Sequence, residues 1–209
     1  MKSIFVSKLL VACCFIGSLH AVMLDPLNSL IFLPKPGNTV TIAQPIIAGI
    51  MIDQNKKPLK NKQVVVYVDN QKVAIVKTNK EGVWSYKLNR MQALSDGSHF
   101  AQAYIKLSNN NDAWAQGSIF TVHATRNEQN LYKSGNVSAA NSAIVFPFEG
   151  NRVNTPTPVV VGSLLDSAFN AVSDETVTLK IDSSTVASPT SDSNGIFSYT
   201  SSSLSDATH

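Results

Sequence analysis

Apolar residues recur at every second position in several short segments of this chain, a spacing that predicts β-strands rather than helices. The clearest case is a pair of equivalent segments, VVVYVD at 64–69 and VTLKID at 177–182. The second segment alternates strictly, and this places Thr178 and Lys180 on the outer side of a strand. The same parity predicts inward positions in both segments: Val177, Leu179 and Ile181 in the second, and Val64, Val66 and Val68 in the first.

The same pattern, applied to the first half of the chain, predicts seven short strands separated by turn signals such as PGN, DNQ, NKEG and SDG. The predicted strands are 39–42, 45–52, 63–69, 72–78, 83–88, 99–107 and 116–124. Seven strands in about 90 residues are typical of an antiparallel immunoglobulin-type sandwich. The predicted fold class is therefore all-β.

The chain contains an internal repeat of the size of a domain. A shift of 113 positions aligns Gly37–Tyr86 with Gly150–Tyr199 without a gap, and after a three-residue deletion LSDGSH at 94–99 meets LSDATH at 204–209. Trp84 matches Phe197, so both are expected to face inward. The pattern predicts two tandem β-sandwiches, the second of which ends before counterparts of the last two strands of the first.

Three segments give this repeat a specific resemblance: GNTVTIAQPIIAGI, VVVYVDNQKVAIVKTNKEGVWSYKL and ALSDGSHFAQAYIKL. They resemble the bacterial immunoglobulin-like repeats of large exported surface proteins, in full over 33–124 and in part over 146–209. The resemblance implies tandem β-sandwiches that serve as a surface stalk or adhesion spacer. Its motifs are specific for the class of repeat and do not specify a ligand.

The composition along the chain suggests five parts: a signal peptide 1–21, a leader 22–31, a first immunoglobulin-like domain 32–124, a polar linker 125–143 and an incomplete second domain 144–209. Because the second domain would lack two strands, we interpret the chain as a fragment of a longer repeat protein. The alternative is a natural incomplete domain that a donated strand completes. A monomer is expected for an intact domain, whereas an open sheet edge could associate.

The first residues are typical of a secretory signal peptide. Lys2 and Lys8 flank a basic region, the apolar run LLVACCFIGSL follows, and Ala21 offers a small residue for cleavage. The segment LVAC also allows the alternative of a lipoprotein anchored at Cys13. The chain has two cysteines, and both lie in this segment, so cleavage after Ala21 leaves a mature chain without cysteine. The predicted location is therefore secreted or at the cell surface, without a transmembrane span after signal removal.

The charge is distributed unevenly between the two domains. Residues 32–124 carry eleven Lys and Arg against five acids, a net charge of +6, whereas residues 144–209 carry two against seven, a net charge of −5. The formal charge of +3 falls to +1 when Lys2 and Lys8 are removed, which argues against nucleic acid as a partner. The linker is mostly polar, so we expect two domains joined head to tail without a large hydrophobic interface.

Residues with catalytic potential do not form a recognisable constellation in the sequence. His99 and His209 occupy one repeat position, and no metalloprotease, nucleophile-elbow or phosphate-loop motif occurs. The chain is therefore predicted not to be an enzyme and to need no cofactor. Calcium rigidifies some adhesins of the resembling class, but here Asp53, Asp69, Asp96 and Asp112 are scattered singly, which does not support a calcium site.

Two segments are candidates for ligand contact. Trp114, in the hairpin NNNDAWAQG, could offer an aromatic platform to a sugar or a protein, or else could cover the end of the core. The loop KKPLKNK carries Lys56, Lys57, Lys60 and Lys62, which could meet anionic groups or could simply be solvated. The partners compatible with these segments are a host or neighbouring-cell surface protein or a glycan. The alternative function is a glycan- or protein-binding accessory module of a secreted enzyme or larger surface protein.

Overall fold

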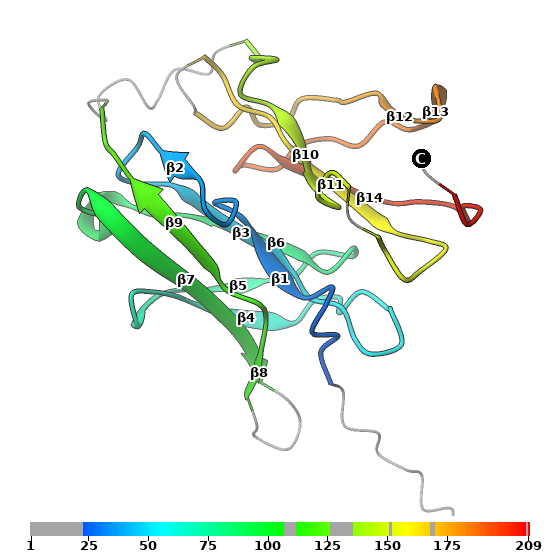
Figure 1. Ribbon diagram of the computed structural model, residues 1–209. Helices are drawn as coiled ribbons and strands as arrows, with labels where there is room; N and C mark the ends of the chain where they lie inside the picture. The colour runs from blue at the N-terminus through cyan, green and yellow to red at the C-terminus, as the bar shows by residue number, and fades with distance from the viewer. Residues whose placement is uncertain (1–22, 107–111, 126–135, 151, 168–169, 208) are drawn as a thin grey trace, which may run out of the picture.

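The computed structural model describes residues 23–106, 112–125, 136–150, 152–167, 170–207 and 209 (Figure 1). The predicted signal peptide, with Cys13, and most of the predicted linker lie outside the described residues. Two units of β-structure follow one another along the chain, and they lie side by side (Figure 1).

The first unit is a sandwich of two sheets, as the strand pattern predicted. One sheet has the order β1-β3-β6, and the other has the order β2-β9-β7-β4-β5, with β8 paired to β7. The strands are β1 (Leu30–Leu33), β2 (Thr39–Val40), β3 (Ile46–Ile50), β4 (Gln63–Val68), β5 (Gln71–Lys77), β6 (Val83–Lys87), β7 (Gly97–Lys106), β8 (Asp112–Trp114) and β9 (Ser118–Val122). A single 3-10 turn, η1 (Arg90–Gln92), precedes β7 within the described chain. The predicted immunoglobulin-like, all-β fold class is confirmed.

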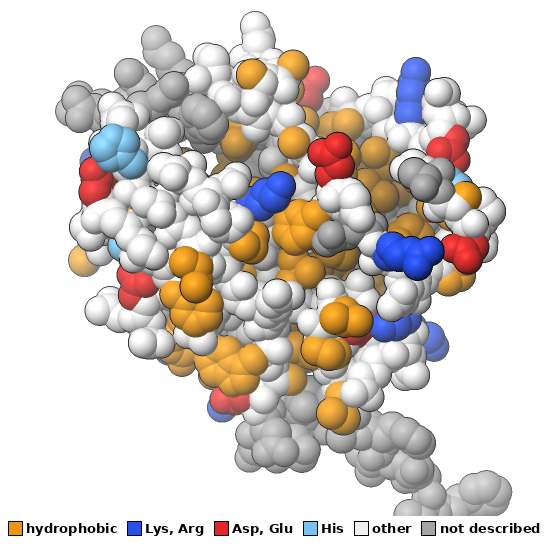
Figure 2. Space-filling model, in the orientation of Figure 1, with side chains coloured by type: hydrophobic (Ala, Val, Ile, Leu, Met, Phe, Trp, Pro, Cys, Tyr) orange, Lys and Arg blue, Asp and Glu red, His pale blue; other side chains and the backbone are white. Residues whose placement is uncertain are grey.

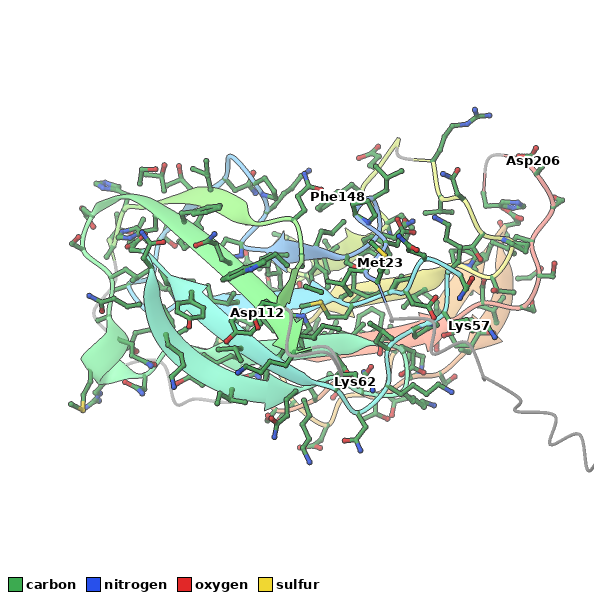
Figure 3. The ribbon with its side chains drawn as sticks, turned by 90° about the horizontal axis from the view of Figure 1, so that it is seen from below. Met23, Lys57, Lys62, Asp112, Phe148 and Asp206 are labelled. Carbon is green, nitrogen blue, oxygen red and sulfur yellow. The ribbon has the colours of Figure 1, made fainter. Side chains whose placement is uncertain are left out.

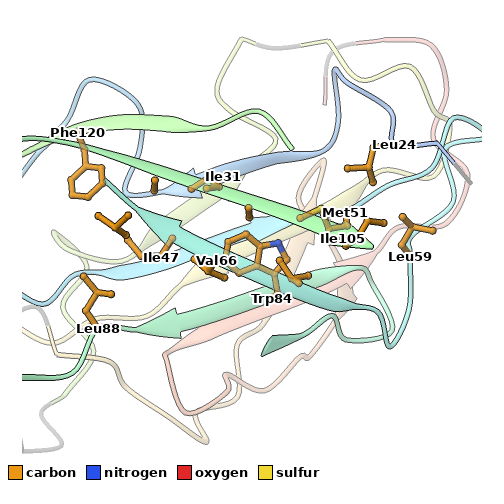
Figure 4. Close-up of a cluster of buried hydrophobic side chains, with 14 of the residues drawn as sticks. Leu24, Ile31, Ile47, Met51, Leu59, Val66, Trp84, Leu88, Ile105 and Phe120 are labelled. Atoms are coloured by element: carbon orange, nitrogen blue, oxygen red, sulfur yellow. The ribbon is translucent and has the colours of Figure 1, made fainter. Parts of the chain in front are cut away.

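Trp84 lies at the centre of the core between the two sheets (Figure 4). Its side chain is 2% exposed, and Val64, Val66 and Val68 are buried around it, which confirms the predicted parity. Gly49 lies opposite Trp84 on the neighbouring strand, where a Cβ atom would come within 2.7 Å of the indole ring. The indole therefore occupies the space that a side chain at position 49 would need.

The first unit begins earlier than the sequence suggested. Leu24 is buried in the core, and β1 starts at Leu30, inside the segment 22–31 that was predicted to be a separate leader. The Ser29 hydroxyl donates to the carbonyl of Ile52 at 2.8 Å and accepts from the Ile52 N–H at 2.9 Å. The boundary at residue 32 is wrong because the gap-free match between the repeats begins only at Gly37.

The second unit repeats these features with the same shift of 113. Its strands are β10 (Ala143–Phe146), β11 (Val159–Ser163), β12 (Leu179–Ile181), β13 (Ser184–Ala187) and β14 (Ile196–Thr200). Sheet β10-β11-β14 matches β1-β3-β6, and the hairpin β12-β13 matches part of β4-β5. Ser142 bonds the backbone of Leu165 as Ser29 bonds that of Ile52, so residues that were assigned to the linker up to 143 belong to this unit.

The predicted absence of a large hydrophobic interface between the units is wrong. The outer face of β1-β3-β6 packs on the outer face of β10-β11-β14, and one cluster of buried residues joins the two sheets. Its buried members come from both units: Leu30, Phe32, Ile46, Ala48, Ile50, Ile52 and Val83 from the first, and Phe146, Val159, Val161 and Ile196 from the second. We call this contact the unit interface. Hydrophobic side chains fill the region between β1 and β10 in the space-filling view (Figure 2).

Polar contacts across the unit interface are reciprocal. The Asn79 amide donates to the Ser198 hydroxyl at 2.9 Å, and the Ser85 hydroxyl donates to Asp192 at 3.1 Å. With the shift of 113, Ser198 is the equivalent of Ser85, and Asp192 is the equivalent of Asn79. Each unit therefore contributes the same positions to the contact, as the two subunits of a symmetric dimer do.

A second pair of polar contacts follows the same rule. Asn194 donates to the Ser85 hydroxyl at 2.9 Å, and Ser198 donates to Glu81 at 3.4 Å, where Asn194 is the equivalent of Glu81. The units are thus related by a pseudo-twofold axis that passes through the unit interface. This arrangement replaces the head-to-tail arrangement that the sequence suggested.

Candidate functional site

Trp114 lies on the outer face of the larger sheet of the first unit. Strand β8 pairs with β7, so that Trp114 is opposite Tyr104 and Ala113 is opposite Ile105. Ala113 and Ala115 pack against the core, and the side chain between them therefore points the other way. Trp114 is 48% exposed and does not cover the end of the core.

Two tyrosines flank Trp114 on the same face, and we call Tyr67, Tyr104 and Trp114 the aromatic cluster. The ring centroids of Tyr104 and Trp114 are 4.7 Å apart at an interplanar angle of 48°. Tyr67 lies 6.0 Å from each of the other two rings, and it stacks on Tyr104 at an angle of 27°. Such offset and tilted pairs are the preferred arrangement of aromatic rings. Three adjacent strands, β4, β7 and β8, therefore hold the rings together, with Trp114 exposed, Tyr67 partly exposed and Tyr104 buried.

The phenol of Tyr104 remains protonated under ordinary conditions. Burial raises the pKa of Tyr104, and the negative charge of Asp112 and the interaction with Tyr67, which includes a hydrogen bond, raise it further. The neutral hydroxyl shares a hydrogen bond with Tyr67, which ties the two tyrosine side chains to each other. The aromatic cluster thus combines apolar ring faces with polar tips, as is usual at recognition surfaces.

Polar side chains border the aromatic cluster on both sides. Lys72 and Gln102 lie across from Tyr67 on the neighbouring strands β5 and β7. On the other side, Lys106 lies across from Asp112 at the end of the β7-β8 pair. The surface is therefore a short aromatic strip between groups that can form hydrogen bonds and ion pairs.

The sequence analysis named Trp114 but missed Tyr67 and Tyr104. The signal was present in the parity of the strands, because inward Val66 and Val68 leave Tyr67 outward, and inward Ala103 and Ile105 leave Tyr104 outward. The pairing of β4 with β7 was not available from the pattern. Without that register, the two tyrosines could not be placed beside Trp114.

The structure divides the four lysines of the basic loop. Lys56 forms an ion pair with the buried Asp25. Burial alone would raise the pKa of Asp25, but hydrogen bonds from Lys56, Asn28 and the Leu27 N–H outweigh it, and the pKa of Asp25 is lowered. Lys56 therefore has a structural role. Lys57, Lys60 and Lys62 are exposed. Lys57 and Lys62 are seen with Asp112 from below the molecule (Figure 3).

A crevice of about 620 Å³ opens beside the unit interface. Its polar lining includes Asn79, Glu81, Ser85 and Asp192. These are the groups that bond one another across the units, so the crevice belongs to the unit interface rather than to a ligand site.

His99 has a structural environment that the second unit repeats. Its Nδ1 lies 2.6 Å from Asp69, and its Nε2 lies 2.8 Å from the carbonyl oxygen of Ser95. His209 lies 2.6 Å from Asp182 in the same way. Burial alone would lower the pKa of His99, but the bonds to Asp69 and Ser95 and the charge of Asp69 outweigh it, and the pKa of His99 is raised.

This raised pKa predicts a pH dependence of stability. The contribution of His99 to the free energy of unfolding should be complete below about pH 6.5, the pKa of an unfolded histidine, and should be lost as the pH rises through the higher folded pKa. In Asp69→Asn, which keeps an oxygen to accept from the Phe100 N–H, this loss should be smaller. Urea unfolding from about pH 5 to about pH 9 measures it. An equal slope in both proteins would contradict the assignment.

Among the described residues, no group of three or more His, Cys, Asp or Glu is placed to hold a metal ion. The same part of the chain contains no helix that is long and apolar enough to cross a membrane.

Comparisons with known proteins give structural neighbours only. No family model matches the sequence, and no curated protein matches it. The fibronectin(III)-like modules of CbhA from Clostridium thermocellum are 13% identical with a TM-score of 0.31, over 50% of this chain and 99% of theirs. The adhesin InvE of Yersinia pseudotuberculosis is 11% identical with a TM-score of 0.37, over 85% of this chain and 52% of its own. A tetra-tandem repeat from a large adhesion protein is 19% identical with a TM-score of 0.32, over 85% of this chain and 42% of its own.

The strand order, the bulges and the repeated register of this chain themselves define two immunoglobulin-like repeats. The chain is similar in fold to bacterial immunoglobulin-like and fibronectin-III-like repeats. It spans about half of the solved InvE chain.

Proposed function

We propose that the chain is an exported, non-enzymatic immunoglobulin-like repeat module that acts at the cell surface in adhesion, through the outer face of its first unit. The observation that carries this proposal is the aromatic cluster, with Trp114 exposed on the open sheet. The opposite sheet of the same unit is covered by the unit interface. The aromatic cluster therefore lies on the side of the first unit that the second unit does not cover.

The polar side chains support a non-enzymatic role. His99 is held by Asp69 and Ser95, and its equivalent His209 is held by Asp182 and Ser205 in the same geometry. A bond that recurs at equivalent positions of a repeat belongs to the fold rather than to a reaction centre. The remaining polar groups between the units bond one another.

Export is proposed from the sequence of the first 21 residues, in which a short basic region precedes an apolar run. Cleavage after Ala21 would release a secreted chain or pass it to the cell surface. Acylation at Cys13 is the alternative, and it would anchor the chain as a lipoprotein.

The geometry changes the role that the module would have in a stalk. Two units that pack side by side add less length than two units joined head to tail. A compact pair is better suited to present a contact surface than to extend a spacer. For this reason the aromatic cluster also favours the second candidate, a glycan- or protein-binding accessory module of a secreted enzyme or larger surface protein.

A bead assay tests the adhesive role. Beads coated with the mature chain should adhere to cells of the producing species or its host, and beads coated with Trp114→Ala should adhere several times less. Met91→Ala is the matched control, because Met91 is 98% exposed and lies in η1, away from the aromatic cluster. Equal adhesion of wild type and Trp114→Ala would refute the proposed surface, and an absence of adhesion in all three would refute the proposed function.

A further inference from the structure

We propose that the aromatic cluster of the first unit binds an anionic saccharide, a carbohydrate that carries carboxylate or sulfate groups. This inference rests on the proposed function and names the ligand class for its contact surface. It is drawn from the geometry of the three rings and from the charges around them.

The aromatic cluster is preorganised for stacking against a flat ring. Trp114 is 48% exposed, and its ring lies 4.7 Å from that of Tyr104 and 6.0 Å from that of Tyr67. Side chains that are already fixed by their neighbours lose little conformational entropy on binding. Sugar rings present a face of C–H groups, and aromatic faces are suited to such apolar surfaces while the tyrosine hydroxyls and nearby amides meet the sugar hydroxyls.

The charges on this face favour an anion. Lys72 and Lys77 point outward from the edge strand β5, across from Tyr67 and Gln63, and Lys106 points outward from β7. One carboxylate, Asp112, lies across from Lys106. Adjacent strands are about 4.8 Å apart, so Lys72, directly across from Tyr67, can reach a ligand that rests on the aromatic cluster, whereas Lys77 lies farther along the same edge, across from Gln63. The face therefore offers three ammonium groups against one carboxylate.

The distribution of apolar groups favours a saccharide over a protein. Phe100 and Ile119 are also exposed on this sheet and lie across from each other, but Gln102 separates them from Tyr104 along β7. A stable protein interface usually buries about 800 Å² on each partner around a continuous apolar centre. The aromatic cluster, which Val65 and the exposed Ile75 extend across to β5, is smaller and is bordered along its strands by hydrogen-bonding side chains.

The second unit serves as an internal comparison. The position equivalent to Tyr67 is Lys180, and the position equivalent to Val65 is Thr178, so the aromatic surface is not repeated. Residues 144–209 also carry a net charge of −5, which repels an anion. One site on each chain is therefore expected, in the first unit.

Intrinsic fluorescence can report on this site directly. Trp84→Phe leaves Trp114 as the only tryptophan, because the chain has two. Phenylalanine already occupies the equivalent position 197, and the indole N–H of Trp84 has no hydrogen-bond partner among the described residues, so the substitution should be tolerated. A change in the emission of this variant then comes from Trp114.

The experiment titrates the mature Trp84→Phe chain with oligogalacturonate, hyaluronan and heparin oligosaccharides, and with methyl-esterified oligogalacturonate as an uncharged control. At least one acidic oligosaccharide should shift the Trp114 emission saturably. Calorimetry should then show at least about tenfold weaker binding for Trp114→Ala, whereas Lys72→Gln with Lys77→Gln should weaken binding and reduce its salt dependence. If the best acidic ligand is oligogalacturonate, its methyl ester should bind at least about tenfold more weakly.

The outcomes separate this inference from the proposed function. Equal binding of the acidic and esterified ligands would overturn the requirement for charge. If none of the three acidic oligosaccharides binds while coated beads still adhere through Trp114, the ligand is not an anionic saccharide, and the inference fails while the proposed function stands. If binding occurs but Trp114→Ala leaves it unchanged, the site is wrong.

Discussion

Trp84→Ala is expected to abolish the cooperative unfolding of the first unit. Trp84 is 2% exposed and contacts both sheets of the core, and removal of such a side chain costs about 3–5 kcal/mol. A domain of this size has a total stability of about 5–15 kcal/mol, so this loss removes a large part of it. Thermal and urea unfolding of the mature chain, followed by circular dichroism, measure the effect.

Trp114→Ala is the matched control for this prediction. The residue is the same, but it is 48% exposed and rests on the outer side of the sheet. Its loss should cost about 1 kcal/mol or less, and unfolding should remain cooperative. Similar losses from the two substitutions would show that the core has been assigned wrongly.

Ile196→Asp is expected to separate the two units. Ile196 is 4% exposed within the unit interface, where it packs with residues of β3 and β6. Burial of a carboxylate without a partner in such a cluster costs several kcal/mol. Separation of the two sheets avoids this cost, because the carboxylate is then hydrated. Amide hydrogen exchange in β10, β11 and β14 should accelerate strongly, and X-ray scattering should show a larger radius of gyration.

Ile144→Asp provides the control in the same sheet. Ile144 lies in β10 and is 49% exposed, so the new carboxylate remains hydrated. Amide exchange and scattering should stay close to those of the wild type. If both isoleucine variants behave alike, the side-by-side packing of the units is refuted.

The fold of each unit could largely be predicted because the repeat gives two independent versions of each strand. A run such as VVVYVD is apolar almost throughout, but its counterpart VTLKID shows which positions can be polar. The same comparison identified Trp84 as a core residue through its match with Phe197. Both assignments follow from alternation, which is a local property of a strand.

The unit interface could not be predicted in this way, because the polar linker suggested independent domains. A signal was nonetheless present in PIIAGIMI at 45–52, which is apolar on both sides of its strand. A strand of this kind is buried on both faces. Here one face meets Trp84 and the other meets the second unit. The aromatic cluster could not be predicted either, because its rings come from three separate strands whose pairing and register the sequence pattern does not give.

The reciprocal contacts of Asn79 with Ser198 and of Ser85 with Asp192 have a thermodynamic consequence. Two separate copies of one unit that met through these positions would associate in a bimolecular reaction, and dilution would dissociate them. When both copies are carried by one chain, the association becomes intramolecular, and the connecting segment sets an effective concentration that is commonly in the millimolar range. The paired state then depends on folding alone, so it persists on dilution.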